Sequence, residues 1–225
     1  MHRSRTHYDL IDAFAGEGCA ICQLTRTAVD RYIDGVGYEF VNDRVFRANL
    51  ELAWAFCNPH AHQWLQQTQH LGTALIYDAV LRTIDRTLEG LSFSPRTTLK
   101  RSSRTLLHPE GACPICAARD EAERSAIKVL IETLPDTDFR TAYLGGNGLC
   151  VPHLRTVLTS TRDASVFATV KDHTLERHTR LRAQLKEFAR KQQHQFSHEP
   201  LGAEHGVTER AVNQVTGAPG IDDGR

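Results

Sequence analysis

Six cysteines stand in this chain as two matching triplets, and any fold must account for that repeat. Each triplet has a C-x-I-C word followed, 34 or 35 residues later, by a C-x-P-H word. Superposing the two triplets needs a gap of one residue and leaves no cysteine over. The sequence therefore predicts an internal repeat. Its members are Cys19, Cys22, Cys57 and His60 in the first copy and Cys113, Cys116, Cys150 and His153 in the second.

Apolar residues between these words recur every three or four positions, which is the period of an amphipathic helix. Alternation with a period of two is nowhere sustained. Pro59 and Pro152 suit the first turn of a helix, so His60 and His153 are expected in such turns. The sequence predicts an all-α protein of two pseudo-symmetric multi-helix halves. The apolar positions after the two C-x-x-C words are Leu24, Ala28, Tyr32 and Val36, and Ala118, Ala122, Ala126 and Leu130.

Composition along the chain predicts four segments. Residues 1–91 form the first helical repeat and residues 108–192 form the second. Between them, residues 92–107 read as a basic linker with Arg96, Lys100, Arg101 and Arg104. The last 33 residues, 193–225, contain five of the fifteen glycines and few large apolar side chains. Such a segment buries too little surface to offset the entropy of ordering, so we expect a disordered, flexible tail.

The four polar side chains of each copy have the composition of a closed structural zinc site. A C-x-x-C turn points two sulfurs at one place, and a cysteine and a histidine three residues apart do the same at the start of a helix. Three thiolates and one imidazole fill a tetrahedral shell and favour zinc over magnesium or calcium. We expect two zinc ions per chain, one in each repeat. The predicted ligand sets are Cys19, Cys22, Cys57 and His60, and Cys113, Cys116, Cys150 and His153.

Three alternative interpretations of the cysteines stay open. Three cysteines and a histidine can also hold an iron–sulfur cluster, although cluster ferredoxins use more compact runs. A C-x-x-C pair at a helix N-terminus can act as a redox dithiol, but no βαβ pattern accompanies it here. The cysteines can also be small buried side chains of a helical core. The matching spacing of both sets favours zinc.

Charge and hydropathy narrow the class of protein. The chain has 27 basic and 27 acidic side chains, so its formal net charge is zero. Zero net charge argues against nucleic-acid binding, which would have to use the basic linker. No segment is long and apolar enough for membrane insertion, and the N-terminus has no apolar stretch typical of a signal peptide. We therefore expect a cytoplasmic protein with reduced cysteines.

No motif identifies a catalytic residue. The sequence has no nucleophile elbow, phosphate loop, H-E-x-x-H word or dinucleotide fingerprint, so we lean against an enzyme. The favoured interpretation is an adaptor or assembly protein that binds a protein partner. Candidate contact regions are the tail and an apolar stripe on the helix expected from about residue 164 to residue 192. The stripe contains Phe167, Val170, Leu175, His178, Leu181, Leu185 and Phe188.

The four words also resemble those of a family of bacterial proteins defined by a domain of unknown function. That family has paired C-P-x-C and C-x-x-H words in a helical chain. The resemblance rests on residues 19–22, 55–60, 113–116 and 148–153 and extends over about residues 8 to 190. Here the first C-x-x-C word has Ala20 where the second has Pro114, a departure that removes no ligand. The resemblance implies a helical fold with tandem motifs, and it implies no activity.

Overall fold

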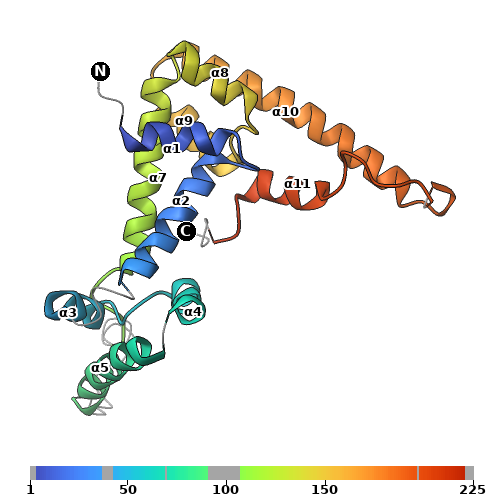
Figure 1. The fold of residues 1–225 in the computed structure, drawn as a ribbon. Helices are drawn as coiled ribbons and strands as arrows, with labels where there is room; N and C mark the ends of the chain where they lie inside the picture. The colour runs from blue at the N-terminus through green and yellow to red at the C-terminus, as the bar shows by residue number, and fades with distance from the viewer. Residues whose placement is uncertain (1–3, 37–42, 69, 91–106, 197, 221–225) are drawn as a thin grey trace, which may run out of the picture. The chain divides into compact units, whose positions relative to one another are not determined.

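The computed structural model describes residues 4–36, 43–68, 70–90, 107–196 and 198–220. The described residues form α-helices, one short 3-10 helix and no β-strand. Figure 1 shows the arrangement of the α-helices. The all-α prediction is confirmed. Among the described helices, none combines the length and the hydropathy that a bilayer-spanning segment needs.

The chain divides into two compact units, and these differ from the two predicted halves, 1–91 and 108–192. Unit 1 consists of residues 1–27 and 121–225, and unit 2 consists of residues 28–120. The unit boundaries fall inside α2 (Ala20–Gly35) and α7 (Pro114–Thr133), so both helices contribute to both units. Each unit therefore draws residues from both sequence repeats. The predicted linker, residues 92–107, lies outside the described residues except for its last position.

Unit 1 has a core that joins the start of α2 to the second part of α7. Around these lie α1 (Arg5–Phe14), α8 (Thr137–Gly145), α9 (Val151–Ser160) and α10 (Ala164–Lys191). Helix α10 begins at a side-chain cap, because the Asp163 carboxylate accepts hydrogen bonds from two backbone amides of the first turn. The largest buried side chains are Leu10, Ile21, Leu130, Leu134, Phe139, Tyr143 and Leu149.

Unit 2 packs the end of α2 and the start of α7 against three other helices. These are α3 (Arg44–Leu52), α4 (Asn58–Gln67) and α5 (His70–Glu89). Trp64 is fully buried, its ring centroid lies 4.9 Å from that of Phe56, and its indole nitrogen donates to Thr73 Oγ1 at 3.0 Å. The core of this unit consists of Val29, Ile33, Val36, Leu50, Ala55, Phe56, Trp64, Ile76, Val80 and Ile115.

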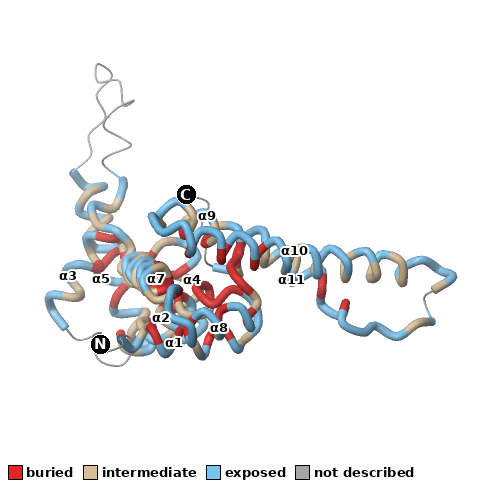
Figure 2. The backbone as a smooth tube through the Cα atoms, turned by 90° about the horizontal axis from the view of Figure 1, so that it is seen from above, coloured by how far each residue is buried: buried red, intermediate tan, exposed pale blue. Residues whose placement is uncertain are grey.

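The prediction of a disordered tail over residues 193–225 is wrong for the described part of that segment. Residues His194–Phe196 form a 3-10 helix, and Val207–Thr216 form α11, which contacts α9 and α10. Figure 2 shows the segment running back along α10. The average composition of the tail does not reveal a short helix, because such a helix needs only one apolar face. Val207, at the start of α11, is fully buried.

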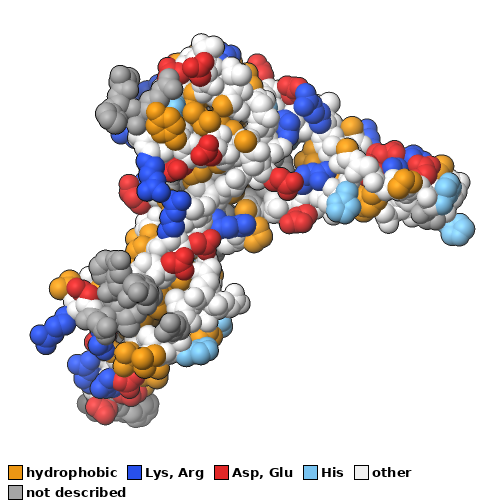
Figure 3. Space-filling model, viewed as in Figure 1, with side chains coloured by type: hydrophobic (Ala, Val, Ile, Leu, Met, Phe, Trp, Pro, Cys, Tyr) orange, Lys and Arg blue, Asp and Glu red, His pale blue; other side chains and the backbone are white. Residues whose placement is uncertain are grey.

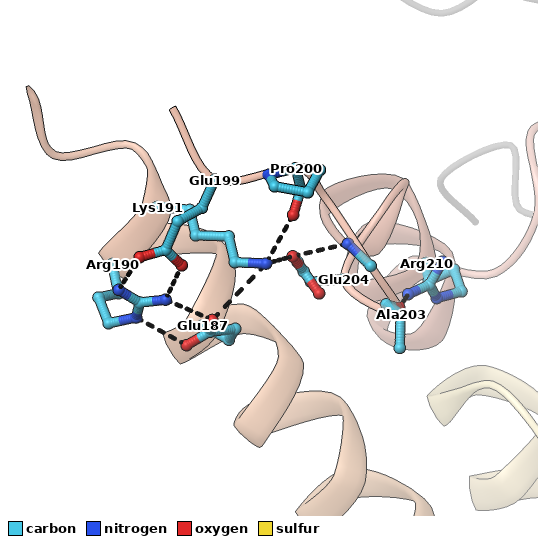
Figure 4. A network of polar contacts seen from close by, with 9 residues as sticks. Glu187, Arg190, Lys191, Glu199, Pro200, Ala203, Glu204 and Arg210 are labelled. Atoms are coloured by element: carbon cyan, nitrogen blue, oxygen red, sulfur yellow. Dashed lines mark hydrogen bonds and ion pairs between the residues drawn. The ribbon is translucent and has the colours of Figure 1, made fainter. Parts of the chain in front are cut away.

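Ion pairs also fasten the returning segment to α10 (Figure 4). Lys191 Nζ lies 2.7 Å from Glu204 Oε1 and donates to the Pro200 carbonyl at 2.8 Å. Arg190 contacts both Glu187 and Glu199. On the face drawn in Figure 3, acidic and basic side chains are interspersed, in keeping with the neutral composition.

The apolar stripe predicted on α10 is divided between core and surface. Val170 is fully buried, whereas Phe167 and Leu175 are 43% and 58% exposed. All buried residues of α10 lie between positions 166 and 174, so only this part of the helix faces the core of unit 1. The stripe is therefore partly a packing surface.

Candidate metal centres

The eight predicted donors assemble into two groups of four, but the groups cross between the repeats. In each group the four donor atoms lie within 4.8 Å of one another. Each C-x-x-C word meets the C-x-P-H word of the other copy, so the predicted pairing within each repeat is wrong. Site 1 consists of Cys19, Cys22, Cys150 and His153, and site 2 consists of Cys57, His60, Cys113 and Cys116.

Site 1 lies in unit 1, where the starts of α2 and α9 supply the donors. Cys150 is the N-cap of α9, and Cys22 lies in the first turn of α2. His153 presents Nδ1 to the sulfurs, at 3.3 Å from Cys19 Sγ, 3.4 Å from Cys22 Sγ and 3.1 Å from Cys150 Sγ. The Cys22 and Cys150 sulfurs are 3.7 Å apart. One imidazole nitrogen and three sulfurs therefore surround a common point.

Site 2 lies in unit 2 and repeats this arrangement with α4 and α7. Cys57 is the N-cap of α4, and Cys116 lies in the first turn of α7. His60 Nδ1 lies 3.2 Å from Cys57 Sγ, 3.7 Å from Cys113 Sγ and 3.3 Å from Cys116 Sγ. The Cys57 and Cys116 sulfurs are 3.5 Å apart. The same nitrogen of the imidazole faces the sulfurs in both sites.

The lengths of α2 and α7 explain the crossed pairing. A helix rises about 1.5 Å per residue, so α2 carries the chain roughly 20 Å from Cys22 before it ends at Gly35. The chain then passes through α3 before it reaches Cys57. Cys57 is therefore far along the chain from Cys19 and Cys22, and it lies beside Cys113 and Cys116 at the start of α7 instead. In the same way, α7 and α8 lie between Cys116 and Cys150.

Backbone contacts between the loops bring the words of each site together. In site 1, Asn147 Nδ2 donates to the Gly16 carbonyl at 2.9 Å. Gly146 lies so close to Phe14 that a Cβ atom there would be 2.7 Å from the Phe14 carbonyl oxygen. In site 2, the Gly111 amide donates to the Leu52 carbonyl at 2.9 Å. Each site is therefore held by a loop-to-loop hydrogen bond as well as by its donors.

The residue two positions before each N-cap cysteine has left-handed backbone geometry. Gly148 has φ of 79° and Ala55 has φ of 64°, and Trp54 beside it has φ of 53°. Glycine adopts this conformation without cost, whereas residues with a side chain are strained in it. The two sites thus use the same turn before the C-x-P-H word, with strain stored in site 2.

Each site gathers two helix N-termini, where the helix dipole favours negative charge. Burial raises the pKa of the Cys19 thiol, but hydrogen bonds with Cys150 and Cys22 outweigh burial and hold this pKa well below its usual value. Burial opposes protonation of His153, yet contacts with the Cys19 and Cys22 sulfurs raise its pKa to about 12. Site 1 therefore favours charged donors, and a metal cation that binds there displaces the remaining protons.

Glu123 extends site 1 beyond its four donors, and sequence reasoning did not find it. Its Oε1 atom lies 3.3 Å from Nε2 of His153, the nitrogen that faces away from the sulfurs. A carboxylate in this position fixes the orientation and tautomer of a metal-binding imidazole. The sequence offers no signal for this contact, because the donor that precedes Glu123 on α7, Cys116, belongs to site 2.

The two sites differ in their exposure to solvent. In site 1, Cys22, Cys150 and His153 are at most 2% exposed, and Cys19 is 9% exposed. In site 2, His60 is buried but all three cysteines are only partly buried. Burial raises the pKa of Cys113 and Cys116, and for Cys116 the nearby Cys113 charge adds to the effect. Because its three cysteines are only partly buried, site 2 is more open to solvent than site 1.

Comparisons with known proteins confirm the resemblance to a family of unknown function and assign no chemistry. A family model described as "Family of unknown function (DUF6062)" matches residues 1–220. One curated relative is the "Uncharacterized 23.9 kDa protein in xynA 3'region" of Caldicellulosiruptor sp. (strain Rt8B.4). It is 26% identical over 159 residues, which cover 69% of this chain and 73% of the relative. No solved structure matches the chain.

Proposed function

This chain belongs to the DUF6062 family of unknown function, and we propose from its own donor groups that it binds one structural zinc ion in each unit. The observation that carries this proposal is the convergence of three sulfurs and one imidazole Nδ1 in both sites. Thiolate and imidazole donors together favour zinc among the common biological cations. Such a ligand set fills all four tetrahedral positions.

The separations between donor atoms support a single ion in each site. Zn–S bonds of about 2.3 Å and Zn–N bonds of about 2.0 Å place two sulfurs about 3.8 Å apart and a sulfur and a nitrogen about 3.5 Å apart. The Cys22 and Cys150 sulfurs are 3.7 Å apart, and the Cys57 and Cys116 sulfurs are 3.5 Å apart. The sulfur–nitrogen distances range from 3.1 to 3.7 Å. Both ranges fit a tetrahedral ion.

The same separations weigh against an iron–sulfur cluster. Ligands of a cluster bind different irons, so they stand farther apart than ligands of one ion. All four donors of each site lie within 4.8 Å of one another. A zinc ion also explains why the donors come from two helix starts, because the metal then fastens two distant parts of the chain.

Metal analysis of the full chain tests this proposal. Protein purified from cells without added zinc should contain two zinc ions per chain and show no visible absorbance band. A brown protein that contains iron and sulfide would contradict the zinc proposal. If neither the purified protein nor a refolded sample contains metal, metal binding itself is contradicted.

Paired substitutions test the crossed ligand sets. Cys19→Ser with Cys150→Ser removes two donors of site 1, so that double variant should lose one zinc. Cys19→Ser with Cys57→Ser removes one donor from each site, so it should lose both. Pairing within the repeats gives the opposite counts. The second double variant serves as the matched control, since each protein carries two cysteine-to-serine changes.

We infer that a protein with two closed metal sites acts through its surface, as a cytoplasmic adaptor or assembly protein. None of the six cysteines is in a disulfide, which suits a reducing compartment. On α5 of unit 2, Leu71, Leu81 and Leu88 are 71%, 57% and 45% exposed and offer apolar contact area.

The adaptor hypothesis is tested in cells that produce the tagged protein at its native level. A genuine partner is recovered in reciprocal purifications and is lost when Leu71→Glu and Leu81→Glu are combined. A Lys128→Glu variant, changed at an exposed site of unit 1, provides the charge control. Failure to recover any reciprocal partner would contradict the adaptor role and leave the zinc proposal standing.

A further inference from the structure

We propose that site 2 is an oxidation site at which a two-electron oxidant such as hydrogen peroxide joins Cys57 to Cys116 and releases the metal ion. This inference rests on the proposed zinc binding in both units. Site 2 is expected to be oxidised, whereas site 1 is expected to stay reduced.

The Cys57 and Cys116 sulfurs are already close. They lie 3.5 Å apart, and a disulfide needs a separation of about 2.05 Å. One sulfur stands at the N-cap of α4 and the other in the first turn of α7. The sulfurs must therefore approach by only about 1.5 Å to form the bond.

Solvent access separates this pair from its counterpart in site 1. The Cys22 and Cys150 sulfurs are also close, at 3.7 Å, yet these residues are only 2% and 1% exposed. Cys57 and Cys116 are partly exposed. Oxidation of a thiolate requires that the oxidant reach the sulfur, so exposure decides which pair reacts. Site 1 is therefore an internal control with the same donor set and a similar sulfur separation.

The reaction consumes one peroxide molecule and two protons. One thiolate of the pair attacks a peroxide oxygen, the O–O bond breaks, and the departing hydroxide takes a proton to become water. The sulfur is now a sulfenic acid. The second thiolate attacks this sulfur, the S–S bond forms, and a second hydroxide leaves and is protonated to water. Two electrons pass from the sulfur pair to the peroxide.

Formation of this disulfide removes two of the four donors of site 2. Cys113 and His60 alone do not complete a tetrahedral zinc shell, so the ion leaves. Unit 2 then exchanges a metal crosslink between α4 and α7 for a covalent one. Unit 1 keeps its zinc. The protein thus has an oxidised form that holds one metal ion.

The experiment uses the full chain, first shown to contain two zinc ions. It is exposed to hydrogen peroxide while released zinc is followed with a colorimetric chelator. Free thiols are then alkylated and tryptic peptides are analysed by mass spectrometry. We expect loss of one of the two zinc ions and a disulfide between peptides 48–82 and 105–119, with fragment spectra that assign Cys116. Dithiothreitol with added zinc should restore two ions per chain.

Several outcomes would overturn the inference. Release of both zinc ions at the same rate, or a disulfide between Cys22 and Cys150, would show that exposure does not select the site. A disulfide between Cys113 and Cys116, or retention of both ions, would reject the proposed pair. Absence of zinc before oxidation would instead contradict the proposed function, so the two failures are distinguishable.

Discussion

Site 1 and site 2 have the same four donor types, but unit 1 encloses its donors while unit 2 leaves three cysteines partly exposed. Site 1 also has support beyond the donors. Glu123 contacts its imidazole, and Gln214 of α11 donates to the Leu149 carbonyl at 2.7 Å, directly before the ligand Cys150. The difference shows that one ligand set can be used in two environments. We therefore expect the buried site to contribute more to stability and the exposed site to be the one that an oxidant reaches.

The largest expected effect comes from removing the N-cap cysteine of each site. Cys150→Ser and Cys57→Ser change equivalent positions, and each should cost one zinc ion. Cys150→Ser also leaves buried donors without their cation, so we expect it to lower the free energy of unfolding by about 3–5 kcal/mol. Cys57→Ser should cost less because its neighbours are solvated. Denaturant unfolding with metal analysis measures both, and equal losses of stability would remove the distinction between the sites.

Two glycines test how tightly the loops of each site are packed. A Cβ atom at Gly146 would lie 2.7 Å from the Phe14 carbonyl oxygen, whereas one at Gly111 would lie 3.1 Å from the Ala53 amide nitrogen. Gly146→Ala should therefore lower the free energy of unfolding by about 2 kcal/mol, and Gly111→Ala by about 1 kcal/mol or less. Urea unfolding of the zinc-loaded variants checks the order. A larger loss for Gly111→Ala would place the tighter loop contact in site 2.

Glu123 offers a smaller and more specific change. Glu123→Gln keeps the shape of the side chain but removes the charge beside His153, so zinc affinity at site 1 should fall by about tenfold. Competition with a chelator of known affinity measures it. Glu121→Gln is the control, because Glu121 is exposed and pairs with Arg124 instead. An equal change in both variants, or a change at site 2, would show that Glu123 acts only through general charge.

The donor residues were predictable from sequence, but their pairing was not. Word spacing identifies the eight side chains because a cysteine and its partner three residues away must share one turn. The pairing depends on how far the helix after each C-x-x-C motif carries the chain before the next C-x-P-H motif. Because both repeats have the same spacing, pairing within a repeat and pairing across the repeats are equally symmetric. The lengths of the helices after Cys22 and Cys116 were the usable signal. The role of Glu123 became visible only after the crossed pairing moved His153 from the first turn of α7, where the predicted pairing places it, to the part of α7 that contains Glu123.

The tail shows a different limit of sequence reasoning. Average composition over residues 193–225 predicted disorder, yet Val207 is buried and Gln214 bonds to the backbone beside site 1. A short helix that docks on an existing surface needs few apolar residues, since the partner surface supplies the rest of the contact. Contacts of this kind link residues far apart in sequence, so composition does not reveal them.

The smallest expected effect concerns the ion pair that fastens this tail segment. Glu204 is nearly buried, and its contacts with Lys191 and the Gly202 amide lower its pKa to about 2. Because this pKa lies below the value of about 4.3 in an unfolded chain, the pair contributes stability above that pH. The contribution is lost as the pH falls through about 2. The pKa of Lys191 is raised by Glu204, so its contribution is fully present below its unfolded value of about 10.4 and is lost as the pH rises from there through the raised pKa.

Glu204→Gln at pH 7 removes this pair without acid, which would also release metal from thiolates. Amide hydrogen exchange in α11 should become modestly faster, and exchange in α9 near Cys150 should follow because Gln214 joins the two helices. Exchange in α4, beside site 2, should not change. Glu209→Gln, at an acidic position within α11 itself, is the matched control. If α4 responds as strongly as α9, the tail does not support site 1 selectively, and the contrast between the two sites then rests on burial and Glu123 alone.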